Sequence, residues 1–441
     1  LRFEMAKLKK LKISSIVSYV RKYISEIEDI RREPKYKQEE IVLSVFAMMF
    51  LQEPSLLKFK ERFEIKQKKE NIERIFGIKE LASDNQIRNI LDKIPSEKLK
   101  ELYKEMFRRL QRSKIHEKFK YIDGNYYLVP IDGTEYFSSN EIHCNHCLET
   151  KHSDGIITYS HKVLQGAIVD PLSNYIIPFE PEEIRNEDGF IKQDCEINAA
   201  KRYMKRIRES HPKLKLVLLG DGLYSNGPII EEAKKHKLSF IFVATETRNK
   251  SMFEFLKDET EEFEEKIKEE QKTIKAKGHP KRTEVHHYRW YNKLVSISEN
   301  SNQLVKFFEF TIYDKDTKKE FFHNTWVTDL NITKDNIERL VNSGRGRWKI
   351  ENNQFLTTKK GGYELEHNYG HGSENLSFNF YLLNVFAFLV HQVLHLTYDN
   401  FNKMKKKSGT FSEMYDFIRQ IIKVIKFNSF EDIVEFFLNT C

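Results

Sequence analysis

The sequence predicts a mixed α/β core between two helical regions, and three observations support this fold class. Residues 1–120 carry apolar side chains at helical spacing, with cap residues ahead of several segments. From about residue 121, short β-rich segments alternate with amphipathic helices. The chain becomes helical again after residue 331. With 441 residues, the chain is long enough for about two to four domains.

The composition is that of a folded globular protein. The hydrophobic fraction is 39%, with 33 Phe and 20 Tyr. No uninterrupted apolar run reaches the roughly 18 residues that span a bilayer. Residues 41–51 and 376–396 are therefore expected to be buried core helices, and no membrane partner is expected. The N-terminal residues lack the apolar segment of a signal peptide. Four cysteines are too few for a disulfide framework, which indicates a reducing cytoplasm.

The positive charge of the chain is concentrated at its start. Residues 1–120 hold 30 Lys and Arg against 19 Asp and Glu, although the net charge of the whole chain is only +8. A basic helical region is suited to capturing an anionic polymer such as DNA. A lysine-rich composition without any such function would give the same excess.

Two expected helices near the end of this region carry start signals. Ser83 and Gln86 have the spacing of a capping box, and Ser96 follows Pro95 at the start of the next helix. Two short helices joined by a tight turn would suit DNA binding by a helix-turn-helix, although many helical bundles that bind nothing show the same pattern. We expect residues 1–120 to form a helical DNA-binding domain.

The central region predicts a sheet built in a defined order. Three strands come first, followed by a helix, a strand, a helix and a last strand. The expected segments are strands at 125–133, 159–170 and 174–180, a helix at 195–210, a strand at 214–222, a helix opened by Pro228 and a strand at 238–245. This order is that of a ribonuclease-H-like fold, with a mixed five-stranded sheet flanked by helices.

The rest of the chain completes this core after an interruption. Residues 121–245 form its first part, and residues 246–330 are expected to be an insertion. Within the insertion, residues 253–277 are interpreted as a charged helix or a solvated linker, followed by β-strands. Residues 331–398 would supply the second part of the core, including a helix that carries Glu351, and residues 399–441 a C-terminal helical region.

Three acids are placed where such a core would bring them together. Asp132 and Asp221 each end an apolar strand, and these two strands lie side by side in the expected sheet. Glu351 lies on a helix that can pack across the strand ends. Most Asp-Gly pairs simply form turns. Asp123 has the same local sequence without a useful strand before it, and is interpreted as such a turn.

Grouped carboxylates raise one another's pKa values unless a cation lies among them. Oxygen ligands of this kind suit Mg²⁺ or Mn²⁺. Two such ions about 3.5–4 Å apart would activate a water and stabilise a leaving oxygen in phosphoryl chemistry. The sequence therefore predicts a site for two Mg²⁺ (or Mn²⁺) ions held by Asp132, Asp221 and Glu351.

Over residues 120–395 the chain resembles the DDE transposases of bacterial insertion sequences, in the insertion-sequence-four-like branch. The resemblance rests on "IDGTEYF", "GDGLYSN" and "RGRWKIENNQFLTTKKGGYELEHNYGHG". It implies a ribonuclease-H-like fold with a β-rich insertion, three acids binding two metal ions, and duplex DNA and a second copy of the chain as partners. It also implies a bacterial or archaeal cytoplasm. It leaves open whether the excised end passes through a hairpin.

The branch has a Tyr-x2-Arg-x3-Glu-x6-Lys signature, which this chain matches in part. Arg347 and Glu351 fit it, whereas Gly344 takes the Tyr position and Thr358 the Lys position. Lys359 comes one residue late, about 80° away from Glu351 on a regular helix. Either the helix is distorted there, or Lys359 reaches the DNA backbone by its own length.

Several neighbours of Glu351 are expected to serve the site. Arg347 and Arg345 would hold phosphates, with Lys359 as a looser contact and Tyr224 as a stand-in for the signature Tyr. Trp348 is expected to pack inward and fix the helix.

A second metal site is suggested by "HCNHCLETKH". Cys144 and Cys147 form a C-x2-C pair that could hold structural zinc, but the usual second pair is missing. Cys195 or His161 could add a ligand only if the fold brought it close. A loop with two reduced thiols is the alternative, and the histidines of "EHNYGHG" are expected only to shape a turn.

These observations predict a DNA transposase that binds the inverted repeats of its element, cleaves the strands and joins the 3′ ends to target DNA. Two alternatives remain open at this point. One is a ribonuclease-H-like nuclease that cuts without joining. The other is a DNA-binding protein with a relic core.

Overall fold

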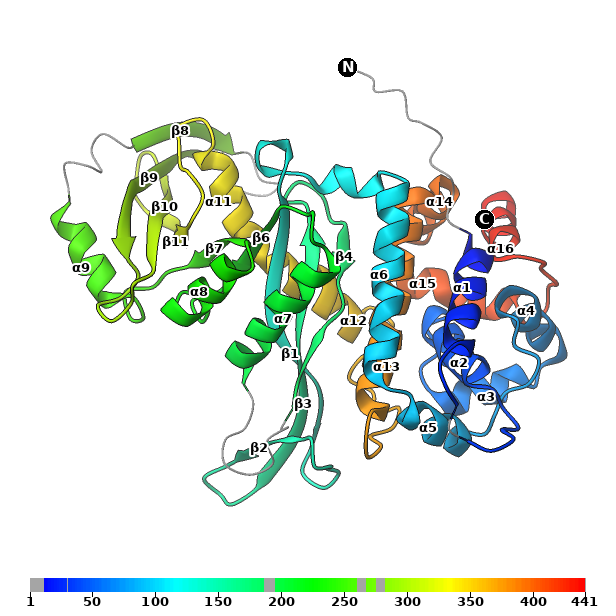
Figure 1. Cartoon of the computed structure of the whole chain (residues 1–441). Helices are drawn as coiled ribbons and strands as arrows, with labels where there is room; N and C mark the ends of the chain where they lie inside the picture. The colour runs from blue at the N-terminus through cyan, green and yellow to red at the C-terminus, as the bar shows by residue number, and fades with distance from the viewer. Residues whose placement is uncertain (1–11, 30, 186–194, 260–266, 275–281, 441) are drawn as a thin grey trace.

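The computed structural model describes residues 12–29, 31–185, 195–259, 267–274 and 282–440. Three parts follow one another across the molecule (Figure 1): a helical body, a central sheet with helices on its faces, and a β-rich extension of that sheet. The chain is thus a mixed α/β protein whose mixed sheet is flanked by helices, and the prediction is confirmed at that level.

Six helices of the first part build one side of the helical body. They are α1 (Ile13–Ser25), α2 (Gln38–Phe50), α3 (Leu56–Phe63), α4 (Lys66–Phe76), α5 (Asp84–Lys93) and α6 (Ser96–Arg112). The Ser83 side chain accepts a hydrogen bond from the Gln86 backbone N–H, so the predicted capping box is confirmed at α5. Two short 3₁₀ turns, η1 (Ile115–Phe119) and η2 (Ile122–Gly124), lead into the sheet.

Four helices from the end of the chain complete the same body. They are α13 (Leu376–Thr397), α14 (Asp399–Ser408), α15 (Phe411–Ile421) and α16 (Phe430–Thr440). Helix α13 packs against α2, α5 and α6, and the ring of Phe46 lies 5.4 Å from that of Phe386. The two ends of the chain therefore share one core.

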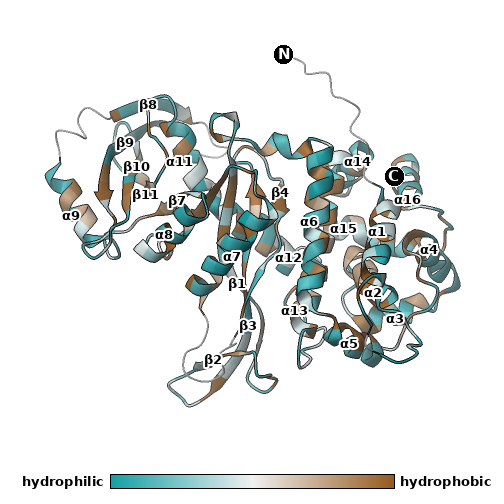
Figure 2. Cartoon of the chain, viewed as in Figure 1, coloured by the Kyte–Doolittle hydropathy of each residue, from teal (hydrophilic) through white to brown (hydrophobic). Residues whose placement is uncertain are grey.

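Helices α2 and α13 are the buried centre of this body, as predicted for residues 41–51 and 376–396. Figure 2 shows hydrophobic residues along both helices and on the central strands. Helix α13 is long and apolar enough to cross a membrane by length and composition alone. However, 89% of its most apolar window is buried inside the protein, as in a core helix of a soluble protein.

The central sheet begins with a long hairpin. Its strands and helices are β1 (Tyr127–Ser139), β2 (Leu148–Lys151), β3 (Ile157–Val169), β4 (Ile176–Pro178), β5 (Glu182–Ile184), α7 (Glu196–Ser210), β6 (Leu216–Gly220), α8 (Gly227–Lys235) and β7 (Ser239–Val243). Strand β1 pairs antiparallel with β3 and parallel with β6, and β6 pairs parallel with β7. The buried β6 consists only of apolar residues and Gly220, as expected for a strand covered on both faces.

The sheet continues beyond β7 into the insertion. Its elements are α9 (Lys250–Asp258), β8 (Ile267–Ile274), β9 (Arg282–Ser296), β10 (Leu304–Asp314) and β11 (Glu320–Thr328). Because β11 pairs with β7, the result is one 11-stranded sheet in the order β2-β3-β1-β6-β7-β11-β10-β9-β8, with β4 and β5 paired to β3. The expected five-stranded sheet is therefore too small, since the insertion is hydrogen-bonded to it.

The prediction for residues 253–277 is partly wrong. Helix α9 covers only the start of this stretch, and residues 267–274 form the edge strand β8 instead of a helix or linker. Residues 260–266 and 275–277 lie outside the described residues. Strand β8 pairs with β9 over its whole length, and its side chains alternate between exposed and half-buried, so backbone pairing stabilises it without an apolar face.

After the insertion, the chain returns across the centre of the sheet. Helix α11 (Ile337–Arg345) runs into the 3₁₀ turn η3 (Gly346–Trp348), the π-helical segment η4 (Ile350–Phe355) and the short helix α12 (Leu356–Lys360). Segment η3 packs on β1 and β6, and η4 packs on β1 and β4. This return segment carries Glu351 to the sheet.

Candidate active site

Asp132 and Asp221 lie just beyond the point where the parallel ladder of β1 and β6 ends, although β1 itself continues to Ser139 beside β3 and is longer than the strand predicted at 125–133. Strands β1 and β6 are parallel, and Pro130 is opposite Leu219 in their register. Each aspartate lies two residues beyond this pair. Polar groups just past the carboxyl ends of parallel strands are the usual position for a ligand site in an open α/β sheet.

Arg347 joins Glu351 to Asp132. Its guanidinium Nη1 lies 2.6 Å from Glu351 Oε1 and 3.7 Å from Asp132 Oδ2. Glu351 is half exposed, and Asp132 is mostly buried, with 20% of its side chain exposed. The arginine therefore stands between two carboxylates that come from opposite sides of the insertion.

A fourth acid, Glu196, completes the group and was missed from the sequence. It lies in the first turn of α7, and its Oε1 accepts a hydrogen bond of 2.5 Å from the hydroxyl of Tyr224. A Cβ on Gly133 would lie 2.3 Å from Glu196 Oε2, so only glycine leaves room for this carboxylate. The glycine directly after Asp132 was a signal that another group approaches the strand there.

The neighbouring carboxylates affect the pKa of Asp132. Burial raises its pKa to about 7, with Glu351 and Glu196 adding to the effect and Arg347 opposing it. Among the described residues, the acids do not form a cluster tight enough to share a metal ion in this chain alone. The donor set nevertheless fits Mg²⁺, because every ligand is a carboxylate oxygen. The single positive charge of Arg347 balances only part of the negative charge of these carboxylates.

Replacing Asp132 by Asn is expected to stabilise the metal-free protein at high pH. The pKa of Asp132 is 3.8 in the unfolded chain and about 7 in the folded one. The folded state therefore binds more protons between these values, and its stability falls as the pH rises. We expect Asp132→Asn to raise the free energy of unfolding by roughly 1–3 kcal/mol at pH 8, and by progressively less towards pH 4.

Urea unfolding without divalent ions, at several pH values between 4 and 8, measures this gain. Asp123→Asn is the matched control, because Asp123 is exposed and its nearest ion-pair partner, Arg339, is 3.9 Å away. A gain that stays constant over this range, or a loss of stability at pH 8, would contradict the assignment of Asp132 as a destabilised carboxylate.

The π-helical segment changes where Lys359 lies. A π-turn contains one residue more than an α-turn, so it shifts all later side chains back by about 100°. Segment η4 contains Glu351 and ends before Lys359, so it offsets the extra residue that separates them. Of the two explanations that the sequence left open for Lys359, the structure thus shows a distorted helix. In this structure Lys359 Nζ is 2.8 Å from Glu366 Oε1.

Two other predicted neighbours occupy unexpected places. Tyr224 is completely buried and donates to Glu196, so the prediction that it contacts DNA is contradicted by its burial. Trp348 was expected to pack inward, but 45% of it is exposed, because Ile350 and Phe355 fill the core side of this segment instead. Arg345 is exposed, with its guanidinium 4.9 Å from the ring centre of Phe322 on β11.

Asp123 lies apart from this group. It belongs to η2, before the start of β1, whereas Asp132 lies within the strand. Its backbone has a φ of 51°, the left-handed conformation that Asp adopts in turns.

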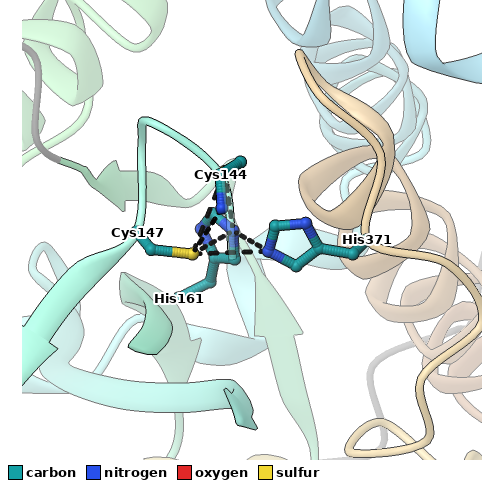
Figure 3. A group of neighbouring side chains, drawn as sticks. All are labelled: Cys144, Cys147, His161 and His371. Atoms are coloured by element: carbon teal, nitrogen blue, oxygen red, sulfur yellow. Dashed lines mark hydrogen bonds between the residues drawn. The ribbon is translucent and has the colours of Figure 1, made fainter. Parts of the chain in front are cut away.

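A separate cluster gathers Cys144, Cys147, His161 and His371 (Figure 3). The two cysteines lie in the loop after β1, His161 lies on β3, and His371 lies in the loop before α13. Their ligand atoms all lie within 4.8 Å of one another. His371, which was expected only to shape a turn, is thus brought to the cysteine pair, whereas the exposed Cys195 is not part of the cluster.

No protein-family model matches this sequence, and no curated protein matches it either.

Proposed function

We propose that this protein is a metal-dependent DNA transposase of the DDE type. The observation that carries the proposal is the placement of three acids: Arg347 bridges Asp132 and Glu351, and Asp221 follows the strand next to that of Asp132. These acids come from two adjacent parallel strands and from the segment that returns after the insertion. Such a group, beside an arginine, suits displacement reactions at phosphorus.

The strand arrangement supports a ribonuclease-H-like core for this proposal. Strands β4, β3, β1, β6 and β7 lie in that order, with β1 antiparallel to β3 and parallel to β6. Read in chain order, these are the third, second, first, fourth and fifth strands of the core. The insertion follows the fifth strand, in agreement with the resemblance of the sequence to the DDE transposases.

We assign different roles to the acids and to the arginine of the site. Asp132, Asp221 and Glu351 would hold two Mg²⁺ or Mn²⁺ ions. When bound, these ions supply an activated water or 3′-hydroxyl and stabilise the leaving oxygen. Arg347 pairs with Asp132 and Glu351 in this structure. Its planar guanidinium can leave these carboxylates and bind a DNA phosphate instead. Asp132 must lose its proton before it can act as a ligand.

Further cations would hold the DNA around this centre. Lys359 follows the π-turn on the same segment, and Arg345 faces the insertion beside Phe322. The basic helical region of residues 1–120 would bind the transposon ends, and a second copy of the chain would complete the synaptic complex. We place this activity in the cytoplasm of a bacterium or archaeon.

The test uses the full-length chain and a duplex that ends in the inverted repeats flanking its coding region. With Mg²⁺ or Mn²⁺, we expect cleavage that exposes a 3′-hydroxyl at the repeat, followed by its joining to a second duplex. A scrambled repeat serves as the control and should not be cleaved there. Cleavage without joining would favour a nuclease, and binding without cleavage would favour a relic core.

A further inference from the structure

The four side chains of the Cys/His cluster direct their ligand atoms at one point (Figure 3). Cys147 and His161 are each only 3% exposed. The two sulfur atoms are 3.9 Å apart, and the two Nε2 atoms of His161 and His371 are 3.1 Å apart. The distance from the sulfur of Cys144 to Nε2 of His161, and those from the sulfur of Cys147 to both Nε2 atoms, range from 3.3 to 3.6 Å.

These distances are those of a tetrahedral zinc site. Zinc bonds of about 2.3 Å to sulfur and about 2.0–2.1 Å to nitrogen place two ligand sulfurs about 3.8 Å apart. The same geometry places two ligand nitrogens about 3.3 Å apart and a sulfur and a nitrogen about 3.6 Å apart. The observed spacings agree with these values to within a few tenths of an ångström.

The hydrogen bonding of His371 also prepares it as a ligand. Its Nδ1 donates to the carbonyl oxygen of Gly372 at 3.0 Å, which leaves a lone pair on Nε2, the atom that faces the cluster. A backbone carbonyl on the far ring nitrogen is the usual way to fix the tautomer of a metal-bound histidine. The two facing Nε2 atoms can share one proton at most, whereas a cation would meet both lone pairs and both thiolates.

We propose that Cys144, Cys147, His161 and His371 bind one structural Zn²⁺ ion. Two sulfur and two nitrogen ligands in a closed tetrahedral set select zinc over Mg²⁺, which prefers oxygen. With four protein ligands the ion has no open position, so its function is to hold the fold together. This site is independent of the carboxylate group around Asp132.

The zinc ion would fasten the β1–β3 hairpin to the segment before α13. That segment is itself held to α5, because Asp92 accepts hydrogen bonds from the backbone N–H groups of residues 373–376. The ring of His371 also packs 4.6 Å from that of Phe137 on β1. The ion therefore connects the sheet to the helical body, next to the contact between the rings of Tyr136 on β1 and Tyr381 on α13.

The metal content of the untagged full-length chain tests this site directly. We expect about one zinc per chain, and a reversible fall in the melting temperature of at least about 5 °C when a chelator removes it. Cobalt substitution should give the thiolate-to-metal absorption of a site with two sulfur ligands. Cys144→Ser, Cys147→Ser and His371→Ala should each weaken zinc binding by more than about 100-fold.

Two substitutions serve as matched controls. His367→Ala changes a histidine of the same loop that packs on Tyr369, and Cys195→Ser changes an exposed thiol, so both should keep one zinc per chain. His371→Cys should retain zinc and add a third thiolate to the cobalt spectrum, even if His371→Ala fails to fold. A wild-type chain without zinc that gains no stability from added zinc would overturn the proposal, as would normal zinc binding by His371→Ala. Neither result depends on DNA cleavage, so the site can fail without the proposed activity, and the reverse.

Discussion

Replacing Asp132, Asp221 or Glu351 by Ala is expected to abolish strand cleavage while leaving the binding of end DNA nearly unchanged. Each carboxylate would be a ligand of a metal ion, and Ala offers no ligand atom in its place. We therefore expect a loss of at least about 10³-fold in cleavage rate. DNA binding should persist because it depends on cations spread over the chain. Cleavage of a labelled end duplex in Mg²⁺ or Mn²⁺, together with a mobility-shift measurement, separates the two effects.

Asp123→Ala is the control for these substitutions and should cleave at the wild-type rate. Asp123 is also followed by glycine, but it lies before β1 and near Arg339. Wild-type cleavage by Asp132→Ala would show that the carboxylate group has a different function. Loss of cleavage in Asp123→Ala would instead indicate that the catalytic site lies before the start of β1.

Arg347→Lys should reduce strand cleavage by roughly 30- to 1,000-fold, because one charged hydrogen bond in a catalytic site contributes about 2–4 kcal/mol to the transition state. Arg347 reaches both Glu351 and Asp132 with one planar group, and a lysine at this position would keep the charge but lose that geometry. Rates measured at saturating DNA and metal give the change directly.

Lys359→Arg is the matched control, since it also exchanges one cation for another on the same segment. Lys359 pairs with the half-exposed Glu366 and touches none of the acids around Asp132, so we expect only a small loss of activity. Equal losses in the two variants would mean that Arg347 acts only as a surface charge of its helix.

The positions of Asp132 and Asp221 could be predicted because they depend on local sequence patterns. The apolar run before Asp132 and that before Asp221 each identify a buried strand, and the order of elements makes the two strands neighbours. The sequence could not show that Glu196 approaches Gly133, because that contact depends on how α7 lies on the sheet. The same limit applies to His371, which is separated from Cys147 by most of the core and the whole insertion.

Other differences arose where a regular element was assumed. The charged residues 267–274 lack an apolar face, so their sequence does not distinguish an edge strand from a solvated helix. The late position of Lys359 indicated either a distorted helix or a long reach, and the π-helical segment is the distortion that the sequence alone could not choose. Trp348 ends the turn η3 and is exposed, whereas Ile350 and Phe355 of the next segment are buried.

Because the sheet is continuous, a force on the insertion is transmitted to the strands at the centre of the molecule. Strand β11 is hydrogen-bonded to β7, and β7 to β6, which ends just before Asp221 (Figure 1). A torque applied to β8–β11 by a bound partner cannot be absorbed by a hinge at this boundary, because ladder hydrogen bonds would have to break. It would instead be passed on as a twist of β6 and, through the parallel ladder between β6 and β1, would also reach the strand that carries Asp132.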